Sequence, residues 1–260
     1  MDLPEGSALD SWVLELDQLD TVAEVRLNGE QLLRADNAFR RHRVRLGGGL
    51  REHGNEIEIL FLSATKEADE RQARQPFFIP YSANNCPIPN GNMLRKAQCH
   101  FGWDWNIALA PLGLYGNARL FRAPDVLIDA VLVKQRHVAS RVSVEVEIAL
   151  DPASQDKLPY TVRLGDQAVT GAVDLSRERR IRAKIEVGEP ELWWPAGLGQ
   201  QKLYDLVVRV GDIEERRRIG LRDMKLVSEP DEVGRSFKVV VNGRDVFCRG
   251  ANWIPADALP

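Results

Sequence analysis

Two tryptophans and an aspartate stand together at Trp103, Asp104 and Trp105, after a run of basic and polar residues. An indole face packs against the C–H face of a pyranose ring, and a carboxylate accepts hydrogen bonds from neighbouring sugar hydroxyl groups. These residue types therefore fit a sugar-binding site. They also fit a structural role, in which the two indoles lie in the core on one face of a strand and Asp104 faces solvent or caps a turn.

A second group of chemically useful side chains lies near the end of the chain, at Asn252, Trp253 and Asp257. A short apolar run, the Asn242-Gly243 pair and a second run predict a β-hairpin just before this group, because Asn-Gly is favoured in two-residue hairpin turns. A loop that presents an amide, an indole and a carboxylate after a hairpin is typical of the entrance to a binding site. For Asp257 a structural role fits as well.

The sequence contains no complete catalytic motif. A phosphate-binding glycine-rich loop and an EF-hand loop are absent, and neither Asp104 nor Asp257 lies in a recognisable acid, base or nucleophile motif. Cys99 and His100 would point to opposite faces of an extended segment, with no second Cys or His pair nearby, so we expect neither a metal site nor a cofactor. The chemistry that the residues suggest is therefore binding.

The composition predicts a soluble protein without nucleic-acid or membrane partners. Its 35 basic and 38 acidic residues are spread along the chain and leave a net charge of −3, so no long-range field attracts a polyanion. No apolar run approaches the roughly 20 residues that span a bilayer, and the N-terminus lacks a signal-peptide pattern. The three cysteines are odd in number and lack CxxC spacing, which indicates reduced thiols and a cytoplasmic protein.

Alternating apolar and polar residues predict β-strands throughout the chain. The clearest case is residues 142–148, where valine or isoleucine occupies every second position, the period of a half-buried strand. The same alternation occurs at residues 57–61, 181–187 and 204–210. The charged stretch 64–75 is the best helix candidate, on the solvated rim. We therefore predict an all-β protein built from sandwich domains.

The pattern of strands divides the chain into three parts. Residues 1–123 fit a jelly-roll-like sandwich whose opening strands are missing from the sequence. Residues 124–223 hold roughly six or seven short strands over about 100 residues, which is the size of an immunoglobulin-like sandwich. Residues 224–260 contain the predicted hairpin and the loop after it.

Four segments taken together resemble the β-mannosidases of glycoside hydrolase family 2. They are RKAQCHFGWDW at residues 95–105, ELWWPAGLGQQKLYDL at 191–206, IGLRD at 219–223 and VVVNGRDVFCRGANWIPAD at 239–257. The segments occur in the family's order, which makes the match more specific than any one of them. The resemblance covers nearly the whole chain and favours the sugar-binding interpretation of the tryptophan loop.

The resemblance implies a galactose-binding-like jelly-roll domain, an immunoglobulin-like domain, and then a (β/α)₈ barrel with a glutamate acid/base and a glutamate nucleophile. A barrel needs roughly 250 residues, so residues 224–260 would hold only a linker and its first strand. The chain is then a fragment, inactive alone, of a retaining enzyme that removes terminal β-D-mannose. Its partner is a β-mannoside or manno-oligosaccharide. The resemblance implies that the substrate is bound by Trp103, Asp104, Trp105, Asn252, Trp253 and Asp257.

Three alternatives stay open. The chain could be a separate carbohydrate-binding module that uses the Trp103 segment as a sugar platform. It could be a β-sandwich interaction protein without enzymatic activity. Within the same enzyme class, a β-galactosidase or β-glucuronidase relative would share the order of domains. Asn106-Ile107 also differs from the Gly-Pro that follows the tryptophans in many relatives, and the oligomeric state is not predicted.

Overall fold

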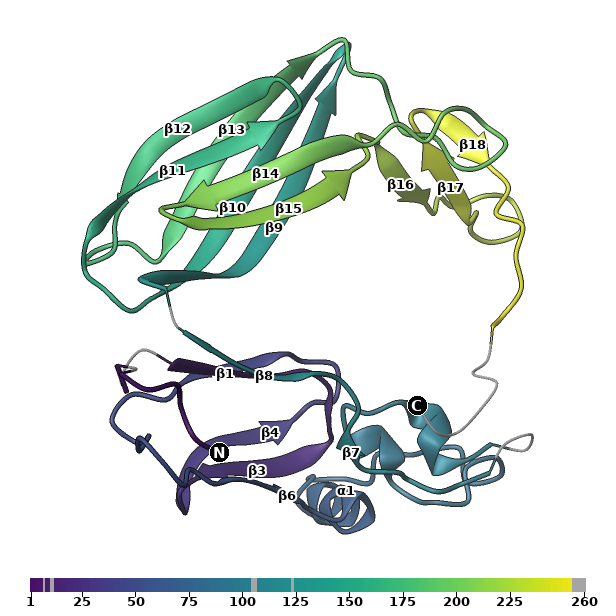
Figure 1. Cartoon of the computed structure of the whole chain (residues 1–260). Coiled ribbons are helices and arrows are strands. Elements are labelled where there is room, and N and C mark those ends of the chain that lie inside the picture. The colour runs from purple at the N-terminus through teal and green to yellow at the C-terminus, as the bar shows by residue number, and fades with distance from the viewer. Residues whose placement is uncertain (7, 10–11, 104–106, 123, 254–260) are drawn as a thin grey trace. The chain divides into compact units, whose positions relative to one another are not determined.

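The computed structural model describes residues 1–6, 8–9, 12–103, 107–122 and 124–253, in which strands predominate and one α-helix occurs (Figure 1). Two compact units make up most of the chain, one containing residues 1–123 and the other residues 124–251. No helix within the described ranges is long and apolar enough to cross a membrane. The prediction of an all-β fold is confirmed.

The first unit is a pair of three-stranded antiparallel sheets with a small ribbon and a helix at one end (Figure 1). One sheet has the order β5-β1-β8 and the other β4-β3-β6, while β2 pairs with β7. The elements are β1 (Trp12–Leu16), β2 (Leu19–Asp20), β3 (Val22–Leu27), β4 (Glu30–Asp36), β5 (His42–Arg45), β6 (Ile57–Phe61), α1 (Ala64–Ala73), the 3-10 turns η1 (Gly91–Met93) and η2 (Gln98–Phe101), β7 (Gly113–Leu114) and β8 (Ala118–Arg122).

Two apolar clusters hold the first unit together. The larger cluster includes Leu14 and Leu16 of β1 and Val25 and Leu27 of β3, and it fills the space between the sheets. The smaller cluster lies under α1. The helix begins where Ser63 accepts a hydrogen bond from the Lys66 backbone N–H at 3.3 Å, a normal N-cap. The helix predicted at residues 64–75 is thus confirmed, with its end two residues earlier.

The second unit is a sandwich of one three-stranded and one four-stranded antiparallel sheet, in the orders β13-β10-β9 and β12-β11-β14-β15. Seven strands in two sheets are typical of an immunoglobulin-like domain. A third, small sheet of order β16-β17-β18 follows. The strands are β9 (Val126–Val138), β10 (Arg141–Pro152), β11 (Lys157–Leu164), β12 (Gln167–Asp174), β13 (Arg180–Gly188), β14 (Tyr204–Val210), β15 (Ile213–Ile219), β16 (Met224–Val227), β17 (Lys238–Val241) and β18 (Arg244–Val246).

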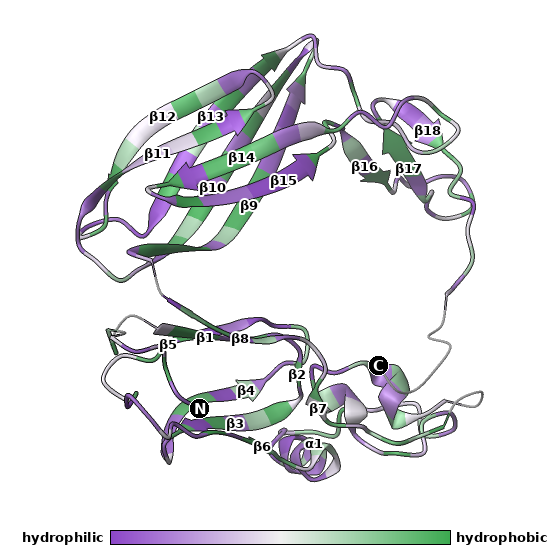
Figure 2. Ribbon diagram, viewed as in Figure 1, coloured by the Kyte–Doolittle hydropathy of each residue, from purple (hydrophilic) through white to green (hydrophobic). Residues whose placement is uncertain are grey.

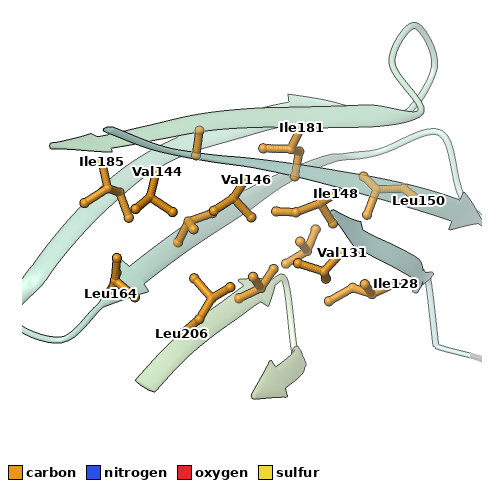
Figure 3. Close-up of a cluster of buried hydrophobic side chains, with 14 of the residues drawn as sticks. Ile128, Val131, Val144, Val146, Ile148, Leu150, Leu164, Ile181, Ile185 and Leu206 are labelled. Atoms are coloured by element: carbon orange, nitrogen blue, oxygen red, sulfur yellow. The ribbon is translucent and has the colours of Figure 1, made fainter. Parts of the chain in front are cut away.

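The core of the second unit follows directly from the alternation in its sequence. Along β10, the side chains of Val142, Val144, Val146 and Ile148 are all buried, with exposures of 1% or less. Their neighbours along the strand are polar, and Figure 2 shows the resulting alternation of colour. The buried side chains of both sheets meet in one layer of aliphatic groups (Figure 3). The burial predicted for residues 142–148 is confirmed.

The tryptophan pair Trp193-Trp194 has the packing role that its place before a turn indicates. Both side chains are partly buried. A Cβ on Gly220 would lie 2.7 Å from the Trp193 Cβ, and a Cβ on Gly199 would lie 2.8 Å from the Trp194 ring. The Arg222 guanidinium covers the Trp193 ring at 4.8 Å, a favourable cation–π distance. These tryptophans therefore pack against the segments at the end of the sandwich.

Candidate functional site

The residues just before Trp103 form the turn η2, whereas the sequence led us to expect an extended segment at Cys99-His100. Phe101 is 2% exposed, and its ring lies so close over Gly91 that a Cβ there would overlap it. His100 is also buried. Neighbours in a strand point to opposite faces, whereas residues Gln98–Phe101 form a 3-10 turn in which both of these side chains are buried. The expectation of an extended segment is therefore wrong.

Glycine is required at position 102, where the chain leaves η2. Gly102 has a φ of +93°, in the region that side chains rarely adopt. A Cβ on this residue would lie 2.7 Å from both the Ala108 Cβ and the Pro87 Cδ. Trp103 follows at once with its side chain 38% exposed. The chain is thus folded sharply so that Trp103 lies at the surface.

Residues 102–103 and 107–111, which we call the Trp103 loop, are held at their base by two hydrogen bonds. The Ala110 backbone N–H donates to the His100 carbonyl at 2.8 Å. The Lys96 ammonium donates to the Pro111 carbonyl at 2.5 Å. Directly after the loop the chain enters β7, in which Gly113 pairs with Asp20 of β2. The loop therefore begins and ends on the same side of the first unit.

A buried ion pair lies under the base of the Trp103 loop. The Lys96 side chain is completely buried and donates to the Asp20 carboxylate, which is itself only 4% exposed. The Thr21 hydroxyl donates to the other Asp20 oxygen. His100 Nδ1 lies 3.6 Å from the same carboxylate. Buried charges must be paired and hydrogen-bonded, and this cluster meets that requirement through Asp20.

Burial governs protonation in this cluster. Burial lowers the pKa of Lys96, against the opposing effects of the hydrogen bond and the charge of Asp20. Burial, and then the positive charge of Lys96, lower the pKa of His100 below its ordinary value of 6.5. His100 is consequently neutral at pH 7. A neutral imidazole thus lies beside the ion pair of Lys96 and Asp20.

The predicted site residues fall into three groups. Trp103 lies in the first unit on the loop described above. Asn252 and Trp253 follow the last strand of the second unit, and Trp253 is 90% exposed. The predictions for Asp104, Trp105 and Asp257 fall outside the described residues. Among the residues that the structure describes, no group of three or more His, Cys, Asp or Glu side chains is arranged to hold a metal ion.

The predicted hairpin before Asn252 forms, with β17 and β18 joined at Asn242-Gly243. Asn242 has a φ of +51°, which asparagine tolerates better than most residues. Its side-chain amide donates to the Trp193 carbonyl at 3.0 Å, and its side-chain oxygen accepts from the Asp223 N–H at 3.0 Å. One side chain thus ties the hairpin turn to the end of the sandwich.

The outer face of the β13-β10-β9 sheet carries a hollow of about 450 Å³ that does not have the character of a sugar site. Three of its charged side chains are already engaged in ion pairs, since Arg182 pairs with Glu147 at 3.1 Å and Lys184 pairs with Glu186 at 2.8 Å. A binding site needs polar groups that converge on a ligand. We therefore regard this face as a solvated surface.

Sequence reasoning missed the Lys96–Asp20 pair. The two residues are separated by 76 positions, and neither lies in a motif whose spacing marks a site. A weak signal was available, since Lys96 stands in the same segment as Trp103, in the stretch that carries the family resemblance. Only the tertiary structure brings Asp20 to it.

Two domains that are described for one protein family match the chain. Residues 1–116 match the domain described as "Glycosyl hydrolase 2 galactose-binding domain-like". Residues 126–222 match the domain described as "Glycosyl hydrolases family 2". Both domains are β-rich in the described structure, as the predicted sandwiches require.

Curated relatives include enzymes named Beta-mannosidase B. The protein from Aspergillus terreus is 34% identical over 268 residues, covering 99% of this chain and 31% of the relative. That from Emericella nidulans is 32% identical over 270 residues, covering 99% of this chain and 31% of the relative. The chain thus spans about a third of the length of the curated relatives that it matches.

Solved structures are also similar to this chain over nearly its whole length. The Beta-D-Mannosidase from Dictyoglomus thermophilum is 30% identical with a TM-score of 0.80, over 96% of this chain and 32% of that one. An exo-chitosanase from Amycolatopsis orientalis has a TM-score of 0.67 at 20% identity, over 98% of this chain and 28% of that one, and it shows the fold alone. From its two matching domains and these relatives, we conclude that the chain belongs to glycoside hydrolase family 2.

Proposed function

We propose that this chain is the amino-terminal part of a retaining β-mannosidase that hydrolyses terminal, non-reducing β-D-mannose residues. The observation that carries the proposal is the likeness of nearly the whole chain both to proteins named Beta-mannosidase B and to a solved β-D-mannosidase. The matched exo-chitosanase is less similar in sequence and in fold. Mannosides are therefore the substrate class that the relatives favour.

In this proposal the first unit supplies one wall of the sugar site. The Trp103 indole lies at the surface, on a loop whose base is closed by hydrogen bonds to the buried His100 and Lys96. An aromatic face of this kind suits the apolar face of a sugar ring, and a fixed loop reduces the entropy lost on binding. By the family resemblance, Asp104, Trp105, Asn252, Trp253 and Asp257 are the further residues that we propose to bind the substrate.

The chain alone is expected to lack turnover. Retaining glycosidases need two carboxylates about 5 to 5.5 Å apart, one as acid/base and one as nucleophile. By the family resemblance, both belong to a barrel that residues 1–260 do not include. One wall of a sugar site can bind and orient a mannoside, but it offers neither a proton donor nor a nucleophile.

The test is a turnover assay with p-nitrophenyl β-D-mannoside. The 260-residue chain is compared with the same chain extended by the coding sequence that follows it, and the p-nitrophenyl β-D-galactoside and β-D-glucuronide serve as substrate controls. We expect mannoside turnover by the extended protein only. Turnover by the chain alone would contradict its assignment as a non-catalytic part. Preference of the extended protein for either control glycoside would contradict the assignment to mannose.

A further inference from the structure

The buried ion pair of Lys96 and Asp20 is unusual within this molecule because it also holds a loop. Of the three ammonium protons of Lys96, one is directed to Asp20 and another to the Pro111 carbonyl. Asp20 is part of β2, whose partner β7 begins two residues after Pro111. Lys96 itself lies two residues before η2, which leads into the loop. One ammonium group therefore connects the entry of the Trp103 loop to its exit.

Other contacts around the base of the loop leave it little freedom. The Ala110 N–H bonds to the His100 carbonyl at 2.8 Å. Gly102 packs so closely against Pro87 and Ala108 that a Cβ has no room. The Gln98 side-chain amide donates to the Lys96 carbonyl at 3.1 Å. The entry of the loop is thus held on several sides, and its exit is held by Lys96, by the Ala110 hydrogen bond, by the packing of Ala110 against the cluster under α1 and by the pairing of β7 with β2.

A charged pair is a costly way to fill a protein core. Removing a carboxylate and an ammonium from water costs several kcal/mol per ion, and apolar side chains of similar volume are often as stable or more so. An apolar pair, however, could not donate a hydrogen bond to the Pro111 carbonyl. The ammonium group of Lys96 instead donates directional hydrogen bonds both to Asp20 and to the Pro111 carbonyl at the loop exit.

We propose that Lys96, paired with Asp20, is a positioning residue that holds the described ends of the Trp103 loop, residues 102–103 and 107–111, in the arrangement that binds a β-mannoside. The inference rests on the proposed function in one respect, since it takes a mannoside to be the ligand of the loop. Without the Lys96 contact the loop samples more conformations. Ligand binding must then order it, which weakens the binding of substrate and transition state alike.

The first experiment measures loop order in the 260-residue chain by hydrogen–deuterium exchange at residues 107–112, where the Ala110 amide is hydrogen-bonded and Pro111 has no amide proton. Lys96→Met leaves Asp20 unpaired, and that variant can fail to fold. The double variant Asp20→Asn, Lys96→Met removes both charges and keeps the test valid. We expect exchange at least about tenfold faster at the loop exit in the double variant, with β10 amides unchanged. Unchanged exchange at residues 107–112 in the folded double variant would overturn the proposal.

Glu15→Gln is the matched control. Glu15 is a second buried acid of the first unit, 2% exposed, and its ion-pair partners Arg41, Arg43 and Arg119 lie outside the loop. This variant also removes the charge of a buried, ion-paired acid in the same domain. It should leave exchange at residues 107–112 as in the unaltered chain. Equal loosening of the loop by Glu15→Gln would show that general destabilisation is the cause, and it would overturn the specific role of Lys96.

The second experiment measures kinetics of the extended protein with p-nitrophenyl β-D-mannoside. Loss of loop order should raise KM at least about tenfold in the double variant with kcat little changed, because substrate and transition state lose the same binding energy. Loss of folded protein alone would instead lower apparent kcat at unchanged KM, and that result would contradict the proposal. If the unaltered extended protein does not turn over the mannoside, the proposed function is wrong, and the role of Lys96 is then decided by loop exchange alone.

Discussion

The two units bury different kinds of side chain, although both are built from antiparallel sheets. Of the described residues, all buried polar and charged side chains lie in the first unit, and Asp20, Lys96, His100 and Glu15 are among them. The buried side chains of the second unit are aliphatic in the same described ranges. The sandwich of the second unit thus needs only well-packed apolar residues. In the first unit, by contrast, the side chains of Asp20, Lys96 and His100 are buried under the base of the Trp103 loop.

This difference separates two ways of stabilising a domain. The free energy gained by burying aliphatic side chains is roughly proportional to the buried apolar area and does not depend on direction. An ion pair with additional hydrogen bonds is directional but adds little net stability over an apolar pair. The second unit is therefore stabilised mainly by apolar packing, and Asn242 anchors the hairpin to its end. In the first unit, directional contacts at Lys96 hold the loop that carries Trp103.

The largest effect should come from breaking the charged cluster of the first unit. Lys96→Met leaves the Asp20 carboxylate buried without its ammonium, and removing one partner of a buried pair costs about 3–5 kcal/mol. We expect the first unit to unfold at a lower urea concentration, while the urea midpoint for unfolding of the second unit stays the same. Residue-resolved hydrogen exchange in urea reads the two units separately. A loss below about 1 kcal/mol would mean that Asp20 finds water or another partner.

A smaller loss is expected from opening a cavity in the second unit. Ile148 is completely buried in the aliphatic layer of Figure 3. Ile148→Ala should cost about 2–5 kcal/mol, whereas Ile148→Val should cost only about 0.5–1.5 kcal/mol. The same exchange experiment should place both losses in the second unit alone. Equal costs for the two variants would contradict a core held together by close packing.

Both Asn-Gly turns should lose stability when the asparagine is replaced, because its side chain is hydrogen-bonded in each unit. Asn242 and Asn28 have φ values of +51° and +52°, and each side chain bonds to a neighbouring segment. Glycine keeps this backbone conformation and removes only the amide. Asn242→Gly removes two side-chain hydrogen bonds and should cost about 1–2 kcal/mol in the second unit, whereas Asn28→Gly removes three and should cost about 2–3 kcal/mol in the first. Thermal unfolding with residue-level readout would check this.

The smallest effect concerns pH. Burial lowers the folded-state pKa of His42 and His100 in the first unit and of His137 in the second. A lowered pKa means that the unfolded chain binds protons first as the pH falls through about 6.5. Both units should therefore lose stability between about pH 7 and pH 5, and the first should lose more. His100→Gln should reduce this loss in the first unit only, as urea unfolding at the two pH values would report.

The parts of the fold that depend on local pattern were predictable. The alternation at residues 142–148 requires a strand with one buried face, and Asn242-Gly243 marks a hairpin because few residues tolerate its backbone. The turn at η2 was not predictable, because it forms to bury Phe101 over Gly91. The Lys96–Asp20 pair was equally hidden, since it joins residues 76 positions apart. Trp103 was found because its residue type and the family resemblance point to it directly.

The most direct test of the account compares one exposed side chain from each unit in the extended protein. Trp103 is 38% exposed on its loop, and Leu132 of β9 is 53% exposed on the outer face of the sandwich. Trp103→Ala should lower kcat/KM for p-nitrophenyl β-D-mannoside at least about tenfold, while Leu132→Ala should leave it within about twofold. An unchanged kcat/KM for Trp103→Ala would contradict the account, because the loop would then have no part in holding the sugar.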